Sequence, residues 1–92
     1  MITKTLTIEN EYGLHMRPAM MVVETSGQFK CNITIIKGEM EADAKSMMEV
    51  TMLAAARGED IKIIAEGKDE QEAINALEEL IKNNLNESIE VM

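Results

Sequence analysis

The sequence predicts an α+β domain in which three helices cover one face of a four-stranded sheet. Segments in which apolar residues alternate with polar ones indicate strands, and apolar residues at helical spacing indicate helices. These segments follow in the order strand, helix, strand, strand, helix, strand, helix, which is typical of an α+β layer architecture. No repeat or linker divides residues 1–92, so we expect one domain, with a tail over residues 83–92 that frays.

The first half of the chain is predicted to form a strand, a helix and a hairpin. Over residues 2–8, isoleucine and leucine alternate with threonine, which is the pattern of a strand with one buried face. The apolar segment that begins at Met16 predicts a helix that ends near Gly27, because glycine is a common C-cap. Residues 32–36 and 39–43 are predicted strands joined by a tight turn.

The second half is predicted to form a short helix, a strand and a final helix. The short helix begins at Ser46 and ends near Gly58, and a strand follows over residues 61–65. Asp69 begins the last helix, where Asp69 and Glu72 match an Asp-x-x-Glu variant of the capping box. Each element therefore has its own local signal, but the pattern does not predict the order of the strands in the sheet.

Composition excludes several classes of function. The net charge of −8 argues against nucleic-acid binding, because phosphate backbones attract clustered lysine and arginine. The single cysteine, Cys31, cannot form an internal disulfide and fits a reducing compartment. No apolar run is long enough to cross a membrane, so we expect a cytoplasmic protein without membrane insertion. The carboxylates of Glu39, Glu41 and Asp43 have no supporting ligands, so neither a metal nor another cofactor is predicted.

The only histidine, His15, stands where a helix is predicted to begin. Pro18 fits a first helical turn, because the N–H that it lacks would have no partner there. Helix N-termini favour anions, and Arg17 adds a guanidinium whose planar fork suits phosphate oxygens. A neutral imidazole is a nucleophile at physiological pH. The segment therefore predicts a site that accepts and holds a phosphoryl group on His15.

Three segments together resemble a known family. Gly13-Leu14-His15-Met16-Arg17-Pro18-Ala19 resembles the phosphorylation motif of HPr, the histidine-containing phosphocarrier protein of the bacterial phosphoenolpyruvate-dependent sugar phosphotransferase system. Lys45-Ser46-Met47-Met48 resembles the family's regulatory serine region, and the segment from Ala65 to Glu70 resembles its last strand-to-helix junction. The spacing of these landmarks matches the family over residues 2–83.

The resemblance implies a fold, a chemistry and partners. The sheet would be antiparallel in the order 1-4-2-3, with His15 exposed at one end and reacting through Nδ1. Phospho-enzyme I would be the donor and enzyme II A components the acceptors, so the protein would be a monomeric carrier and not an enzyme. The backbone N–H groups of Met16 and Arg17 are predicted to cradle the phosphate, whose charge the Arg17 guanidinium would offset.

Ser46 is open to two interpretations. Ser46-Met47-Met48-Glu49 fits a Ser-x-x-Glu capping box, in which Ser46 and Glu49 satisfy each other's backbone N–H groups. The resemblance implies instead that an HPr kinase/phosphorylase phosphorylates Ser46 and that regulatory proteins read this change. Glu49 departs from the neutral or basic residue of the family, and its charge would repel a phosphate on Ser46.

Four of the nine methionines are predicted to surround His15. They are Met16, Met20, Met47 and Met48. Methionine fills cores well, so burial is one interpretation of these residues. Methionine-rich surfaces also repack against several partners, and the resemblance places two helix starts side by side. We therefore expect these four side chains to form a partner interface.

Other positions depart from the family pattern and support an alternative function. Tyr12 stands where a small polar residue is common, Met16 where alanine is common, and Ala54 where glycine is expected at the end of the second helix. The alternative is a regulatory HPr-like module that controls partners by binding, with little or no role in sugar transport. Phosphoryl transfer to His15 discriminates between the two, because such a module does not require it.

Overall fold

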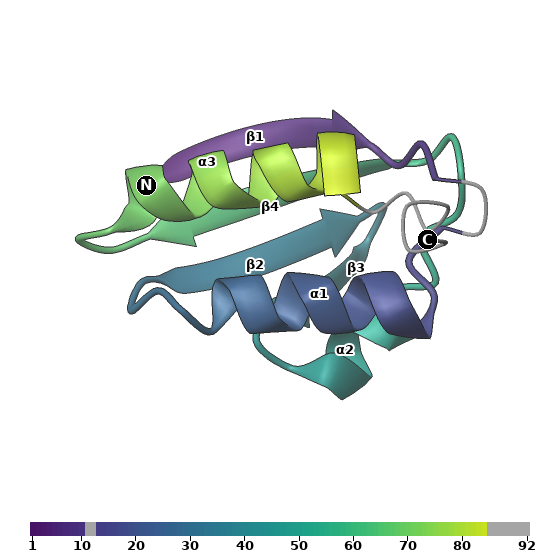
Figure 1. Ribbon diagram of the computed structural model, residues 1–92, viewed down its shortest axis with the longest axis horizontal. Coiled ribbons are helices and arrows are strands. Elements are labelled where there is room, and N and C mark those ends of the chain that lie inside the picture. The colour runs from purple at the N-terminus through teal and green to yellow at the C-terminus, as the bar shows by residue number, and fades with distance from the viewer. Residues whose placement is uncertain (11–12, 85–92) are drawn as a thin grey trace.

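A computed structural model describes residues 1–10 and 13–84 of the chain. Its elements are β1 (Ile2–Thr7), α1 (Met16–Ser26), β2 (Asn32–Lys37), β3 (Met40–Asp43), α2 (Met47–Met52), β4 (Asp60–Glu66) and α3 (Glu70–Glu79) (Figure 1). A π-helical turn, Leu80–Asn84, continues α3. The predicted order of elements is confirmed, whereas the prediction of fraying falls mostly on residues 85–92, which lie outside the described residues.

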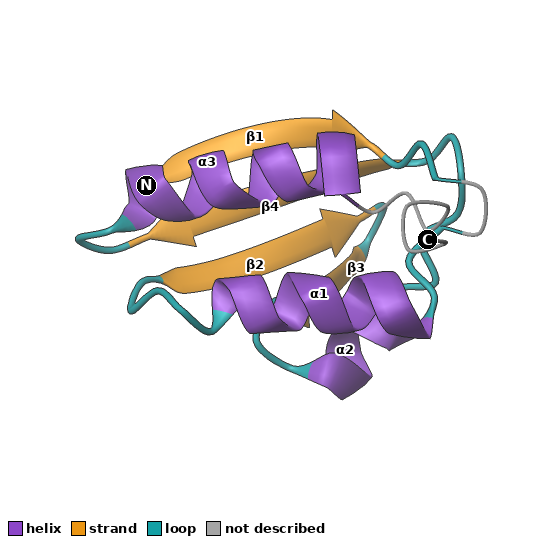
Figure 2. Ribbon diagram, viewed as in Figure 1, coloured by secondary structure: helices purple, strands orange, loops and turns teal. Residues whose placement is uncertain are grey.

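The four strands form one antiparallel sheet in the order β1-β4-β2-β3, as the resemblance implies. Leu6 lies opposite Ile61 in the β1–β4 pair, and Ile35 lies opposite Ile63 in the β2–β4 pair. This register places the apolar residues of neighbouring strands on the same face, since side chains alternate along each strand. The three helices cover that face, which makes the domain a two-layer α+β structure (Figure 2).

The core lies between the sheet and the helices. The strands contribute alternating residues such as Ile33, Ile35 and Ile63, all buried, and the helices contribute Val22 and Leu77. Burial of one such side chain stabilises the fold by about 1.5–3 kcal/mol before the entropy of ordering is counted. The helices are therefore positioned by the apolar face of the sheet.

The helix α2 ends at Met52, well before the predicted end near Gly58. The amides of Leu53 and Ala54 donate to the carbonyls of residues three positions earlier, which tightens and ends the helix. Ala54 then adopts a left-handed conformation with φ of 50°, which costs a residue with a Cβ about 1–2 kcal/mol. The prediction of a longer helix was wrong because this reversal lies inside an apolar, alanine-rich segment.

Asp69 is the N-cap residue of α3, but its side chain does not make the predicted capping hydrogen bond. Its carboxylate accepts hydrogen bonds from the backbone N–H groups of Lys30 and Cys31, at 2.8 and 2.9 Å. These bonds, above all the one from Lys30, hold the pKa of Asp69 below its ordinary value. The capping box with Glu72 was therefore wrong, because the loop before β2 offers two donors to the same carboxylate.

Replacing Ala54 with glycine is expected to stabilise the protein by about 0.5–1 kcal/mol. Glycine relieves the left-handed conformation, although it also raises the entropy of the unfolded chain by about 0.4–1 kcal/mol. Ala56 lies in the same loop but has no positive φ. Ala56→Gly therefore only raises the entropy of the unfolded chain, which destabilises the protein, and it serves as the control. Urea unfolding curves of the two variants measure the difference. Equal changes in both variants would contradict the assigned strain.

Candidate functional site

His15 is exposed and forms the N-cap of α1. Its carbonyl accepts the first helical hydrogen bond, from the Ala19 amide at 2.9 Å, and its side chain makes no capping bond. The backbone N–H groups of Met16 and Arg17 precede that first bond and have no helical carbonyl to reach, while Pro18 has no N–H. The helix therefore directs two backbone donors toward the position of the imidazole.

The positive end of α1 is not offset by an acidic residue of its own first turn. The first turns of the other two helices both contain glutamate, at Glu49 in α2 and at Glu70 and Glu72 in α3. Arg17 adds a positive charge to the first turn of α1 instead. Of the three helix starts, that of α1 is thus the one whose electrostatics favour an added anion.

The backbone before His15 is fixed by the loop that follows α2. The Leu14 amide donates to the Ala55 carbonyl at 2.8 Å, and the Leu14 side chain is buried. Gly13 has a φ of 69°, and a Cβ at this position would overlap the Ala55 carbonyl oxygen. Only glycine fits this close approach, so Gly13 and Leu14 hold His15 against residues 54–56 (hereafter the alanine loop).

A surface hollow of about 410 Å³ lies directly beside the imidazole. It is lined by Leu14, His15, Met16 and Thr51 and by the alanine loop. The alanine side chains are small, so the hollow leaves room next to His15. Figure 1 shows that the start of α1 and the loop before β4 lie at the same end of the domain.

The four predicted methionines differ in exposure. Met16, Met20 and Met48 are 68%, 44% and 69% exposed, whereas Met47 is half-buried and packs against the core. Met52, 63% exposed, was missed by the sequence analysis, although it lies one helical turn after Met48 on the same face of α2. The helices α1 and α2 thus each present two exposed methionines. Their role as a partner interface stays a prediction.

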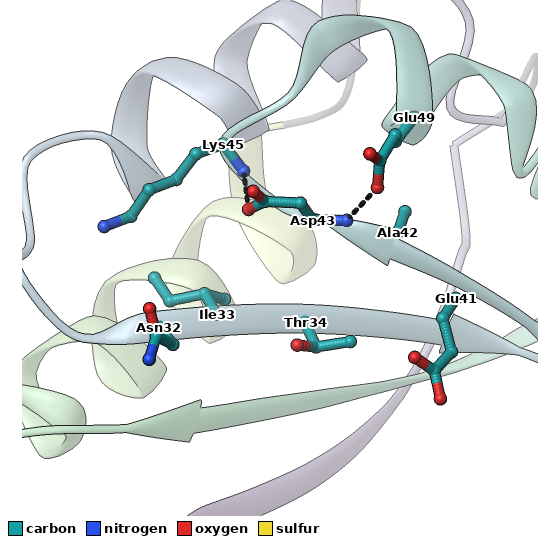
Figure 3. A pocket seen from close by; sticks show the side chains of 8 residues that line it. All are labelled: Asn32, Ile33, Thr34, Glu41, Ala42, Asp43, Lys45 and Glu49. Atoms are coloured by element: carbon teal, nitrogen blue, oxygen red, sulfur yellow. Dashed lines mark hydrogen bonds between the residues drawn. The ribbon is translucent and has the colours of Figure 1, made fainter.

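Ser46 caps α2, and its hydroxyl accepts a hydrogen bond from the Glu49 amide at 3.2 Å. The reciprocal half of the predicted capping box was wrong, because the Glu49 carboxylate accepts from the Asp43 amide at 2.7 Å instead. The Asp43 carboxylate in turn accepts from the Lys45 amide (Figure 3). Two carboxylates therefore lie close in the chain to the Ser46 hydroxyl, at the edge of a second hollow of about 400 Å³.

Cys31 and Tyr12 were also singled out in the sequence. Cys31 is buried, which is the main reason that its pKa is raised, and within residues 1–10 and 13–84 no three metal-binding side chains gather. Tyr12 lies outside the described residues. None of the described helices combines the length and apolar character that a membrane span requires.

Comparison with known proteins identifies the family. Residues 2–83 match the family model for the PTS HPr component phosphorylation site. The chain belongs to the HPr family. Members of this family are phosphocarriers, so the general role of the chain is to carry a phosphoryl group rather than to catalyse a reaction.

Relatives of known sequence and structure agree with the HPr assignment. The phosphocarrier protein HPr of Treponema pallidum is 34% identical over 87 residues, which is 95% of this chain and 99% of that one. An HPr from Thermoanaerobacter tengcongensis superimposes with a TM-score of 0.86 at 41% identity, covering 89% of this chain and 92% of that one. The phosphoryl donor subunit DhaM of a PEP-dependent dihydroxyacetone kinase from Providencia stuartii is 36% identical over 88 residues, 96% of this chain but 18% of DhaM.

Proposed function

We propose that His15 accepts a phosphoryl group from phospho-enzyme I and passes it to enzyme II A components of a sugar phosphotransferase system. The observation that carries this proposal is the exposed imidazole at the start of α1, beside a hollow and at a helix end without acidic residues. In the first transfer, Nδ1 of His15 forms a bond to phosphorus as the bond between phosphorus and the donor breaks. The reverse exchange on the acceptor regenerates the free imidazole.

The phosphorylated state is stabilised by the N-terminus of α1. The backbone N–H groups of Met16 and Arg17 donate to the phosphate oxygens, and the Arg17 guanidinium offsets their charge. A helix terminus contributes about 0.3–1 kcal/mol to such an interaction at the surface. This moderate stabilisation suits a carrier, because a tightly held phosphoryl group would not be released to the acceptor.

The exposed methionines form the docking surface for donor and acceptors. Met16 and Met20 on α1 and Met48 on α2 present exposed, flexible apolar side chains, and Met47 packs against the core beside Met48 in the chain. Met52 extends the same surface along α2. Methionine adapts its shape at low cost, so one surface can dock several partners.

A different acceptor is supported by the likeness to DhaM. Because that subunit carries a segment similar to this chain and serves as the phosphoryl donor of a dihydroxyacetone kinase, the phosphoryl group on His15 would pass to a kinase of this type instead of an enzyme II A component. The chemistry at His15 is the same in both cases. Transfer assays with each acceptor distinguish them.

We expect His15→Ala to abolish phosphorylation, because no other described side chain stands in this helix-end environment. Wild-type and variant proteins are incubated with phosphoenolpyruvate and enzyme I, and the acid-labile phosphohistidine is detected on denaturing gels. Glu72→Ala, an exposed change in the first turn of α3, is the control and is phosphorylated like the wild type. An unchanged yield in His15→Ala would remove this site and favour the regulatory module.

We expect Arg17→Lys to slow transfer by roughly tenfold, which corresponds to about 1.4 kcal/mol of transition-state stabilisation. Lysine keeps the positive charge but loses the planar fork that matches phosphate oxygens. The only other arginine, Arg57, is exposed, and Arg57→Lys is the matched control. Quenched-flow measurement of His15 phosphorylation gives the rates, and equal rates in both variants would exclude a phosphate role for Arg17.

We also propose that Ser46 serves α2 as a cap and is a poor substrate for an HPr kinase/phosphorylase. Phosphorylation would break the bond from the Glu49 amide and place the new charge near Asp43 and Glu49. Mass spectrometry after incubation with the kinase is expected to find little modification in the wild type and more in a Glu49→Gln variant. Stoichiometric modification of the wild type would contradict this assignment.

A further inference from the structure

The alanine loop is held by the side chains of Glu59 and Lys37. The Glu59 side chain accepts a hydrogen bond from the Ala56 amide at 2.7 Å, and the Glu59 amide donates back to the Ala56 carbonyl at 3.0 Å. The Nζ atom of Lys37 lies 3.4 Å from the Glu59 carboxylate and 3.4 Å from the Ala54 carbonyl oxygen. Glu59 and Lys37 therefore contact both ends of the alanine loop.

Glu59 and Lys37, hereafter the clamp, are both attached to the sheet. Lys37 is the last residue of β2, and Glu59 directly precedes β4. The Glu59 carbonyl accepts from the Ile8 amide at 2.9 Å, and the Gly58 amide donates to the Ile8 carbonyl at 2.7 Å. The clamp thus fixes the alanine loop relative to the sheet. Ala55 of this loop in turn holds the Leu14 amide, which directly precedes His15.

The clamp contributes more to position than to stability. The Glu59 side chain is 45% exposed, and an exposed ion pair of this kind stabilises a fold only slightly. The Ala56 N–H bond, followed by Lys37, lowers the pKa of Glu59, so the carboxylate is ionised throughout the neutral range. The left-handed Ala54 lies inside the clamped segment, where strain would otherwise favour relaxation of the loop.

We infer that Glu59, supported by Lys37, is a positioning residue for phosphoryl transfer at His15. Neither side chain touches the phosphoryl group. They hold the alanine loop, which fixes the Leu14 amide, the start of α1 and one wall of the hollow that receives the donor. The inference rests on the proposed transfer at His15, and it predicts a rate effect because small misplacements of a reacting group slow transfer steeply.

The test compares Glu59→Ala, Glu59→Gln and Lys37→Met with the Glu72→Ala control. Glu59→Ala is expected to lower the maximal rate of His15 phosphorylation by enzyme I about tenfold with the KM for this protein unchanged, since the docking surface is intact. Glu59→Gln retains an acceptor for the Ala56 amide and recovers most of the rate. Lys37→Met removes only the outer contacts and is expected to lower the rate by less than Glu59→Ala. Amide NMR shifts of Leu14 and Ala55 should move in Glu59→Ala but not in Glu72→Ala.

Each outcome decides the inference. Equal rates in Glu59→Ala and Glu72→Ala would overturn it while leaving the proposed function intact. A lower rate matched by an equal loss of folded protein in urea unfolding, without recovery in Glu59→Gln, would assign Glu59 a purely structural role and also overturn it. If enzyme I does not phosphorylate the wild type, the proposed function fails, and the inference fails with it.

Discussion

The contact between Gly13-Leu14 and Ala55 is the constraint on which the site depends. It joins two loops that are about forty residues apart in the sequence, and it fixes where α1 begins. Because Gly13 has no Cβ, the two backbones approach closely enough for the Leu14 amide to reach the Ala55 carbonyl at 2.8 Å. His15 follows immediately, so its exposure and its place at the helix end are consequences of this one backbone contact. A residue with a Cβ at Gly13 would press against the Ala55 carbonyl and displace the backbone that leads to the imidazole.

Local signals in the sequence predicted the elements and the position of His15 well. Alternation along β1 predicted its buried face, because a sheet with one covered face imposes that period directly on the chain. Pro18 predicted the start of α1, because a proline is confined to the first turn of a helix. The order of the strands in the sheet could not be predicted from local signals. It came from the resemblance to the HPr family, since the pairing of β4 between β1 and β2 depends on contacts that no local pattern records.

The predictions that were wrong share a physical cause. Asp69 and Glu49 were each assigned to a helix cap from their spacing, but both carboxylates bind backbone amides that the tertiary fold brings close. A carboxylate accepts from whichever donors lie nearest, and sequence spacing shows only the donors of its own segment. The early end of α2 was missed for a related reason. The left-handed conformation of Ala54 is held by surrounding contacts, and alanine itself carries no signal for it.

The charges at the three helix starts explain how an acidic protein can favour a phosphate at one place. With a net charge of −8, the chain repels anions over most of its surface. Glu49, Glu70 and Glu72 already occupy the positive ends of α2 and α3, so an added phosphate gains little there. Only α1, of these three helices, begins without an acid and with Arg17 in its first turn. For the transfer proposed at His15, the acidic background would weaken retention of the phosphoryl group, while the donors proposed at the start of α1 would hold it in place.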